Sequence, residues 1–118
     1  MEMFREVSAV YLHREPVDFR KSINGLSVIV ENEMEMSPFS GALYVFTNRA
    51  RDKLKLIYWD NSGFALFYKR LEKDKFHWPR RWPEPLITLS ESQLHWLLAG
   101  YNITQMRPHE TVQYASVL

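Results

Sequence analysis

The alternation of apolar and polar positions predicts a sheet of about four to five short strands. Runs rich in β-branched and aromatic residues, bounded by turn residues, are typical of strands. Such runs occupy residues 7–13, 42–46, 53–59, 64–71 and, as an edge candidate, 86–89. The turn "DNSG" at 60–63 separates two of them, and its residues favour a tight connection. We therefore expect an antiparallel β-meander.

Apolar residues at spacings of three and four predict a helix between the first two runs. They are Phe19, Ile23, Leu26, Ile29/Val30 and Met34. Asp18 stands directly before them, where a carboxylate can accept hydrogen bonds from the first free amides of a helix. The helix is therefore expected to begin at Phe19 and to end at Ser37-Pro38, since the residue before a proline disfavours helical backbone.

A second helix is predicted after residue 90. Ser90 and Gln93 have the spacing of a capping box, and Gly100 is suited to ending the helix. Its inner face would carry Leu94, Leu97 and Leu98. The expected fold is α+β, with both helices packed on one face of the meander. We expect residues 1–100 to form a single domain and 101–118 a loosely packed tail.

Composition agrees with one globular domain, because 118 residues with 46% hydrophobic content suffice for one core. The chain has no cysteine, which excludes disulfides and thiolate metal sites. Its first residues lack the pattern of a signal peptide, and no run approaches the ~18 apolar residues of a membrane span. We expect a cytoplasmic protein with no membrane association.

Charge is unevenly distributed, although the net charge is only +1. Residues 1–48 hold four basic and seven acidic side chains, residues 49–81 hold ten and four, and residues 82–118 hold one and three. The balances are −3, +6 and −2, which sum to the total. The middle third is therefore the basic part, and a row of one sign suits phosphate groups.

Alternation along residues 49–55 predicts that four basic side chains project from one face of a strand and its loop. More basic residues follow in the strand end and connector at 69–81. The candidate DNA-binding residues are Arg49, Arg51, Lys53, Lys55, Lys69, Arg70, Arg80 and Arg81. The alternative is a solvated sheet face whose lysines prevent edge pairing.

Three aromatic residues, Phe76, Trp78 and Trp82, lie among these basic positions. Aromatic rings between basic residues are one way in which single-stranded nucleic acid is held. The other interpretation makes them core, and we favour it for the tryptophans. We thus expect any contact with DNA to be ionic rather than aromatic.

No pattern in the chain indicates catalysis. The four histidines have no metal-ligand spacing, and no glycine-rich phosphate loop or nucleophile motif is present. A metal-dependent nuclease would need several carboxylates on rigid elements. Asp18, Asp60 and Glu72 fall at a helix cap, a turn and a strand end, where structural roles suffice. We expect no enzyme activity, no catalytic residue, no metal and no cofactor.

An ordered series of motifs over about 70 residues resembles the accessory protein, often labelled Orf2 or TnpB, of bacterial insertion sequences of family sixty-six. They are D-F-R-K-x-I-x-G-L at 18–26, P-F-S-G at 38–41, F-x-N-R at 46–49, K-L-K-x-x-Y-W-D at 53–60, G-F-x-L-x-Y-K-R-L at 63–71 and F-x-W-P at 76–79. The match is weaker beyond residue 82.

The resemblance implies a non-catalytic accessory protein for DNA transposition, working with a separate transposase and other proteins of the same element. Our leading hypothesis adds weak, non-specific DNA binding through the basic residues above. In the alternative, the protein is an assembly adaptor without DNA contact, and apolar surface near Trp78, Trp82 and the tail docks the transposase. The sequence leaves the oligomeric state open.

Overall fold

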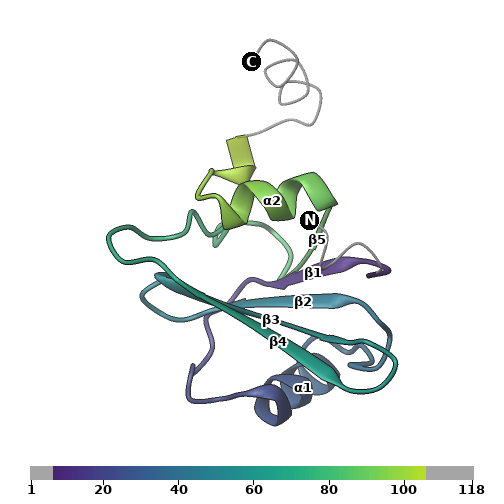
Figure 1. The fold of residues 1–118 in the computed structure, drawn as a ribbon. Coiled ribbons are helices and arrows are strands. Elements are labelled where there is room, and N and C mark those ends of the chain that lie inside the picture. Colours follow the sequence, from purple (N-terminus) through teal and green to yellow (C-terminus); the bar gives the residue numbers. More distant parts are fainter. Residues whose placement is uncertain (1–6, 106–118) are drawn as a thin grey trace.

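The computed structural model describes residues 7–105, which form a five-stranded sheet with a helix on each face (Figure 1). The elements are β1 (Val10–His13), α1 (Ile23–Asn32), β2 (Leu43–Thr47), β3 (Lys53–Trp59), β4 (Phe64–Arg70), β5 (Leu86–Leu89), α2 (Glu91–Leu98) and a short 3-10 helix (Ile103–Gln105). The predicted α+β class is confirmed.

The strand order is β4-β3-β2-β1-β5, and the sheet is mixed. β2, β3 and β4 form the predicted antiparallel meander, closed at Asp60–Gly63 by a hydrogen bond of 3.0 Å from the Asp60 amide to the Gly63 carbonyl. The prediction of a purely antiparallel sheet is wrong at β1, which pairs parallel to β2 with Val10 opposite Leu43. α1 lies between these strands in the chain and provides the crossover that a parallel pair requires.

The two helices lie on opposite faces of the sheet, so the prediction that they share one face is wrong. Leu26 and Val30 of α1 pack in one buried cluster with Phe46 of β2. Leu97 of α2 packs in the other cluster with Val45, also of β2. The sequence "LYVFT" of β2 is buried at every position, as expected for a central strand covered on both faces.

α1 begins four residues later than predicted, and Asp18 is not its cap. Ser22 holds the N-cap position without a side-chain hydrogen bond, and the helix ends at Asn32. The Asp18 carboxylate instead accepts hydrogen bonds from the Arg20 amide at 2.9 Å and from its guanidinium, with Oδ2 and Nη2 2.6 Å apart. These bonds lower the pKa of Asp18 to about 2.

We expect this aspartate to make stability pH-dependent under acid conditions. The pKa of Asp18 lies at about 2 in the folded protein, below its ordinary value of 3.8. Its stabilising effect is therefore complete above pH 3.8 and is lost as the pH falls through about 2. Urea unfolding between pH 2 and 4 should show a shallower pH dependence in Asp18→Asn. Arg20→Gln, which removes the partner, should behave alike; an unchanged dependence in both variants would contradict the assignment.

The prediction for α2 is confirmed. Ser90 Oγ accepts a hydrogen bond from the Gln93 amide at 3.1 Å, and Gln93 Oε1 accepts one from the Ser90 amide at 2.8 Å. After the helix, Gly100 has a φ of +95°, a left-handed conformation that favours glycine. Of the predicted tail, residues 101–105 include Ile103, which is buried beside α2, whereas residues 106–118 lie outside the described residues.

Candidate nucleic-acid interface

The long connector between β4 and β5, residues 71–85, crosses one end of the sheet. β1, β2 and β4 run in the same direction, so their last residues lie at this end, and the antiparallel β5 begins there. Because β4 and β5 are the two outer strands, a chain that joins them must pass the ends of the strands between (Figure 1). The topology thus brings the connector over the β2–β3 loop and the end of β1.

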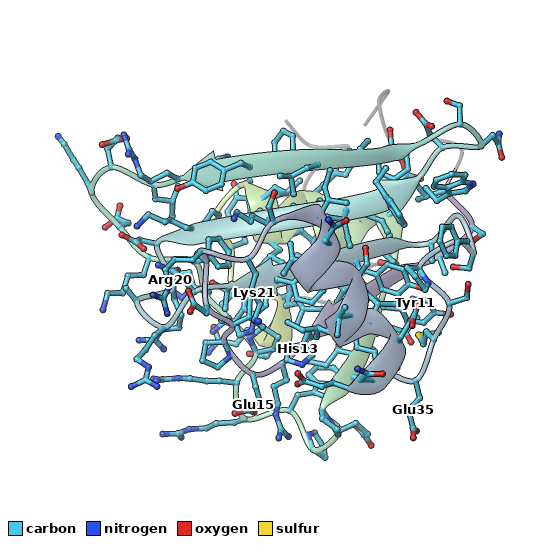
Figure 2. All side chains as sticks on the ribbon, turned by 90° about the horizontal axis from the view of Figure 1, so that it is seen from below. Tyr11, His13, Glu15, Arg20, Lys21 and Glu35 are labelled. Carbon is cyan, nitrogen blue, oxygen red and sulfur yellow. The ribbon has the colours of Figure 1, made fainter. Side chains whose placement is uncertain are left out.

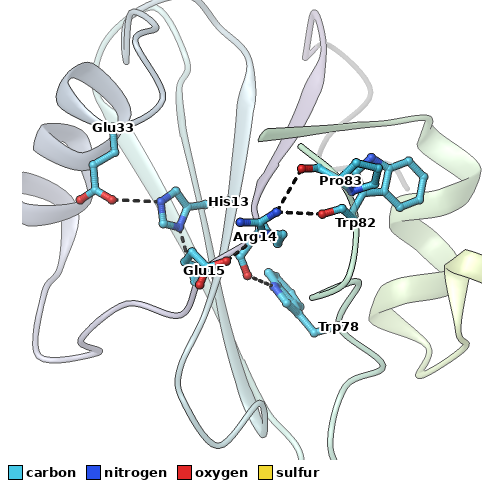
Figure 3. Close-up of polar contacts among 7 residues, drawn as sticks. All are labelled: His13, Arg14, Glu15, Glu33, Trp78, Trp82 and Pro83. Atoms are coloured by element: carbon cyan, nitrogen blue, oxygen red, sulfur yellow. Dashed lines mark hydrogen bonds and ion pairs between the residues drawn. The ribbon is translucent and has the colours of Figure 1, made fainter. Parts of the chain in front are cut away.

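Hydrogen bonds hold the connector in this place. The Phe76 amide donates to the Arg51 carbonyl at 2.7 Å, and Trp78 Nε1 donates to the Arg14 carbonyl at 2.8 Å. In return, Arg14 Nη1 donates to the Trp82 carbonyl at 2.8 Å (Figure 3). Trp78 is buried in the core, as predicted for it. Its burial also removes it from the exposed apolar surface that the adaptor hypothesis requires.

The segment after β1 is itself anchored on its other side. His13 is buried, and its ring nitrogens lie 2.8 Å from the Glu15 carbonyl and 3.2 Å from Glu33 Oε1 (Figure 3). These contacts join the end of β1 to the residue that follows α1. Arg14 therefore leaves the sheet from a fixed backbone.

Four arginines from three segments surround one pocket at this end of the sheet. The pocket has a volume of about 160 Å³, and Pro16, Thr47 and Trp78 complete its lining. The arginines, which we call the arginine cluster, are Arg14, Arg49, Arg51 and Arg80. The side chain of Arg14 is engaged with the connector and with Glu15. Within residues 7–105, the side chains of the other three have no hydrogen-bond or ion-pair partner.

Hydrogen bonds hold the backbone of the β2–β3 loop, which carries Arg49 and Arg51. The Asn48 side chain accepts a hydrogen bond from the Lys53 amide at 3.1 Å and donates one to Asp52 Oδ1 at 2.7 Å. This donation lowers the pKa of Asp52 below its ordinary value. Arg51 has a φ of +61°, a left-handed conformation uncommon outside glycine, and its carbonyl binds the connector.

A larger hollow of about 930 Å³ lies beside the pocket, between the connector and the end of α2. Arg51, Trp78 and Arg80 line both spaces, so two members of the arginine cluster lie between them. Lys75 and Arg81 add positive charge to the larger hollow, whose lining includes one carboxylate, Asp74. The surface at this end is therefore concave and predominantly basic.

Lys55, predicted to bind DNA, is a buried structural residue. It shares the face of Lys53, as the alternation predicted, but the segment leading into α1 covers that face at Lys55. Its Nζ donates to the carbonyls of Phe19 at 2.9 Å and Lys21 at 2.7 Å, and it lies 4.9 Å from the centre of the Phe19 ring. Burial lowers the pKa of Lys55. Figure 2 views this face from below, with α1 lying across the sheet.

Two more of the predicted basic residues also have structural partners. Lys69 Nζ donates to the carbonyl of Leu98, the last residue of α2, at 2.8 Å. Arg70 Nε lies 2.9 Å from Glu72 Oε1. The eight predicted positions thus divide: Arg49, Arg51 and Arg80 meet at the pocket, Arg81 lines the hollow, and Lys53 lies partly buried at the base of the loop.

Arg14 is the member of the arginine cluster that the sequence analysis missed. It precedes the basic third of the chain and stands between a histidine and a glutamate, so no local pattern marks it. Its place depends on the parallel pairing of β1 with β2, which brings residues 14 and 49 to the same end of the sheet. Knowledge of that pairing would have identified it.

Neither a metal centre nor a membrane span was found among residues 7–105. That part of the chain contains no group of three or more metal-ligating histidine, cysteine, aspartate or glutamate side chains. Neither of its α-helices is long and apolar enough to cross a bilayer.

Comparison with known proteins identifies the family. Residues 8–108 match the family described as "IS66 Orf2 like protein". Two similar proteins come from Sinorhizobium fredii (strain NBRC 101917 / NGR234): "Uncharacterized protein y4jC", 36% identical over 79% of each chain, and "Uncharacterized protein y4hO", 34% identical over 86% of each chain. No solved structure matches. The match spans the sheet, both helices and the basic connector, and the chain therefore belongs to the Orf2-like family of IS66 insertion sequences.

Proposed function

We propose that this protein is a non-catalytic accessory factor in DNA transposition that binds DNA phosphates through the arginine cluster. The observation that carries the proposal is the convergence of Arg49, Arg51 and Arg80 on one pocket without a partner for their side chains within residues 7–105. Guanidinium groups match phosphate geometry and stay charged at any physiological pH. They bind and position phosphates but supply no nucleophile, which suits an accessory role.

The contact is expected to be weak and independent of sequence. Phosphate contacts fix the position of a protein on DNA but carry no sequence information themselves. The choice of element ends would then belong to the transposase and to other proteins of the same element. The hydrogen-bonded β2–β3 loop and connector favour this function, because they hold the backbone that carries the arginines before DNA arrives, so that binding has to order only the side chains.

The salt dependence of DNA binding tests the proposal. With three phosphates neutralised, log K should fall with log salt with a slope of about −2.7, three times the −0.9 expected per phosphate on duplex DNA. Fluorescence anisotropy with a duplex from the element end would measure it. A scrambled duplex of equal length should bind within a few-fold of this affinity.

Two results would count against the proposal. No retention of DNA at about 50 mM salt would refute phosphate binding. Cleavage of the duplex in Mg²⁺ or Mn²⁺ by the purified protein would refute the non-catalytic role.

A further inference from the structure

β4 leaves one edge of the sheet open over seven residues. It pairs with β3 from Lys53–Arg70 to Trp59–Phe64, and no other strand within residues 7–105 pairs with it. The opposite edge, β5, is four residues long. Short edge strands are one way in which proteins prevent unwanted pairing. The sheet therefore has a short edge strand, β5, on one side and a long edge strand, β4, on the other.

The backbone of β4 presents hydrogen-bonding groups on this open side. Just beyond the two ends of the β3–β4 ladder, Asp60 is hydrogen-bonded to Gly63 and Leu71 to Asp52. These two pairs show which residue pairs between them exchange backbone hydrogen bonds. Since bonded and non-bonded pairs alternate, residues 65, 67 and 69 direct their amides and carbonyls toward β3. The residues that direct theirs outward are Phe64, Leu66, Tyr68 and Arg70.

Five of the seven side chains of this edge strand, Phe64 to Tyr68, are apolar or aromatic. Leu66 is 37% exposed and Tyr68 48%, and both lie on the face that α1 covers. Beside them, Phe39 is 56% exposed and packs against Trp59 and Phe64, with ring centres 5.2 and 5.4 Å away. A long edge strand of this kind is a site for pairing with another strand.

We propose that two copies of this chain associate through β4, antiparallel about a two-fold axis at Phe67. This register pairs all seven residues of β4 and joins the two five-stranded sheets into one of ten strands. It places Leu66 opposite Tyr68 of the partner subunit, and both of these positions direct their backbone groups outward. The proposal is independent of DNA binding.

Self-complementarity is the reason for choosing a second copy as the occupant. The two charged residues of β4 lie at one end of the strand, in "FALFYKR". In the antiparallel register, Lys69 meets Ala65 and Arg70 meets Phe64 of the other copy, so no like charges stand opposite each other. The Arg70 guanidinium would also be attracted to the aromatic ring of Phe64 in the other copy. A symmetric contact of one patch with itself is the commonest form of homodimer.

The oligomeric state of the complete 118-residue chain tests the proposal. Sedimentation equilibrium should give a dimer, twice the chain mass of 14.1 kDa. Leu66→Lys, which places a charge at the centre of the edge, should raise the dissociation constant at least tenfold. Thr88→Lys, on the exposed side of β5 at the other edge, is the matched control and should remain dimeric. Circular dichroism would verify that both variants fold.

Cysteine crosslinking tests the register, since the chain contains no cysteine. Facing bonded residues lie about 5.5 Å apart, within disulfide range. Leu66→Cys/Tyr68→Cys should therefore form covalent dimers under oxidation, and neither single variant should. A chain that is monomeric at about 1 mM, where a millimolar dissociation constant would be visible, would overturn the proposal. A dimer that resists Leu66→Lys, or one that the double variant does not crosslink, would equally overturn it.

Discussion

Replacement of Trp78 by alanine is expected to lower the free energy of unfolding by about 3–5 kcal/mol, the usual cost of removing a buried tryptophan side chain. Trp78 is 6% exposed and packs in the cluster that contains α2. Its loss would also leave the Arg14 carbonyl without the bond that Trp78 Nε1 donates at 2.8 Å. Guanidinium unfolding followed by circular dichroism would measure the change.

Two variants separate the parts of this effect. Trp78→Phe keeps most of the apolar packing but loses the indole donor, and about 1–3 kcal/mol is expected from the unpaired carbonyl. Trp82→Ala removes a neighbouring tryptophan that is only partly buried and whose contact with Arg14 is through its backbone carbonyl. Trp82→Ala should lower the free energy of unfolding by less than half as much as Trp78→Ala does. Equal losses in the two alanine variants would contradict the anchoring role of Trp78.

Removal of Arg49, Arg51 and Arg80, whose side chains have no partner within residues 7–105, is expected to weaken DNA binding by about 10²–10³-fold at 0.1 M salt. The reason is that each lost phosphate contact contributes a factor of about 8 there. The variant is Arg49→Gln/Arg51→Gln/Arg80→Gln. The slope of log K against log salt should become shallower by about 2.7. Anisotropy titrations between about 50 and 200 mM salt would measure both changes.

A matched triple variant controls for the loss of net charge. Arg20→Gln/Lys21→Gln/Arg70→Gln also removes three positive charges, but none of these residues lines the pocket or the hollow. Arg20 and Arg70 are paired with Asp18 and Glu72. The control should leave the salt slope nearly unchanged. If both triple variants weakened DNA binding equally, the affinity would depend on the overall charge of the protein and not on the arginine cluster.

The local elements of the fold could be predicted because their signals are local. Turn residues marked the hairpin at 60–63, and the pair Ser90 and Gln93 marked the start of α2. Asp18 misled the prediction of α1, since its carboxylate is engaged by Arg20 two residues later and not by helix amides. A capping residue and an ion-paired aspartate look the same in a single sequence.

The arrangement of the elements could not be predicted, because it depends on partners distant in the chain. The unbroken apolar run of β2 was the one signal that both faces of the sheet are covered. Alternation correctly placed Lys53 and Lys55 on one face, but nothing in the sequence showed that the segment before α1 would bury Lys55. Arg14 lines the pocket because β1 lies beside β2 in the sheet, and no local sequence pattern indicates that arrangement.

The place of β1 in the sheet has a consequence for synthesis of the protein. β1 is made first, but one of its two neighbours, β5, follows more than seventy residues later. As the chain leaves the ribosome, the edge of β1 that pairs with β5 stays unpaired until residues 86–89 emerge. All residues that line the pocket precede β5, but the hollow beside it is also lined by Ala99, Gly100, Asn102 and Thr104. A nascent chain that has not passed β5 therefore lacks part of the concave surface at this end of the sheet.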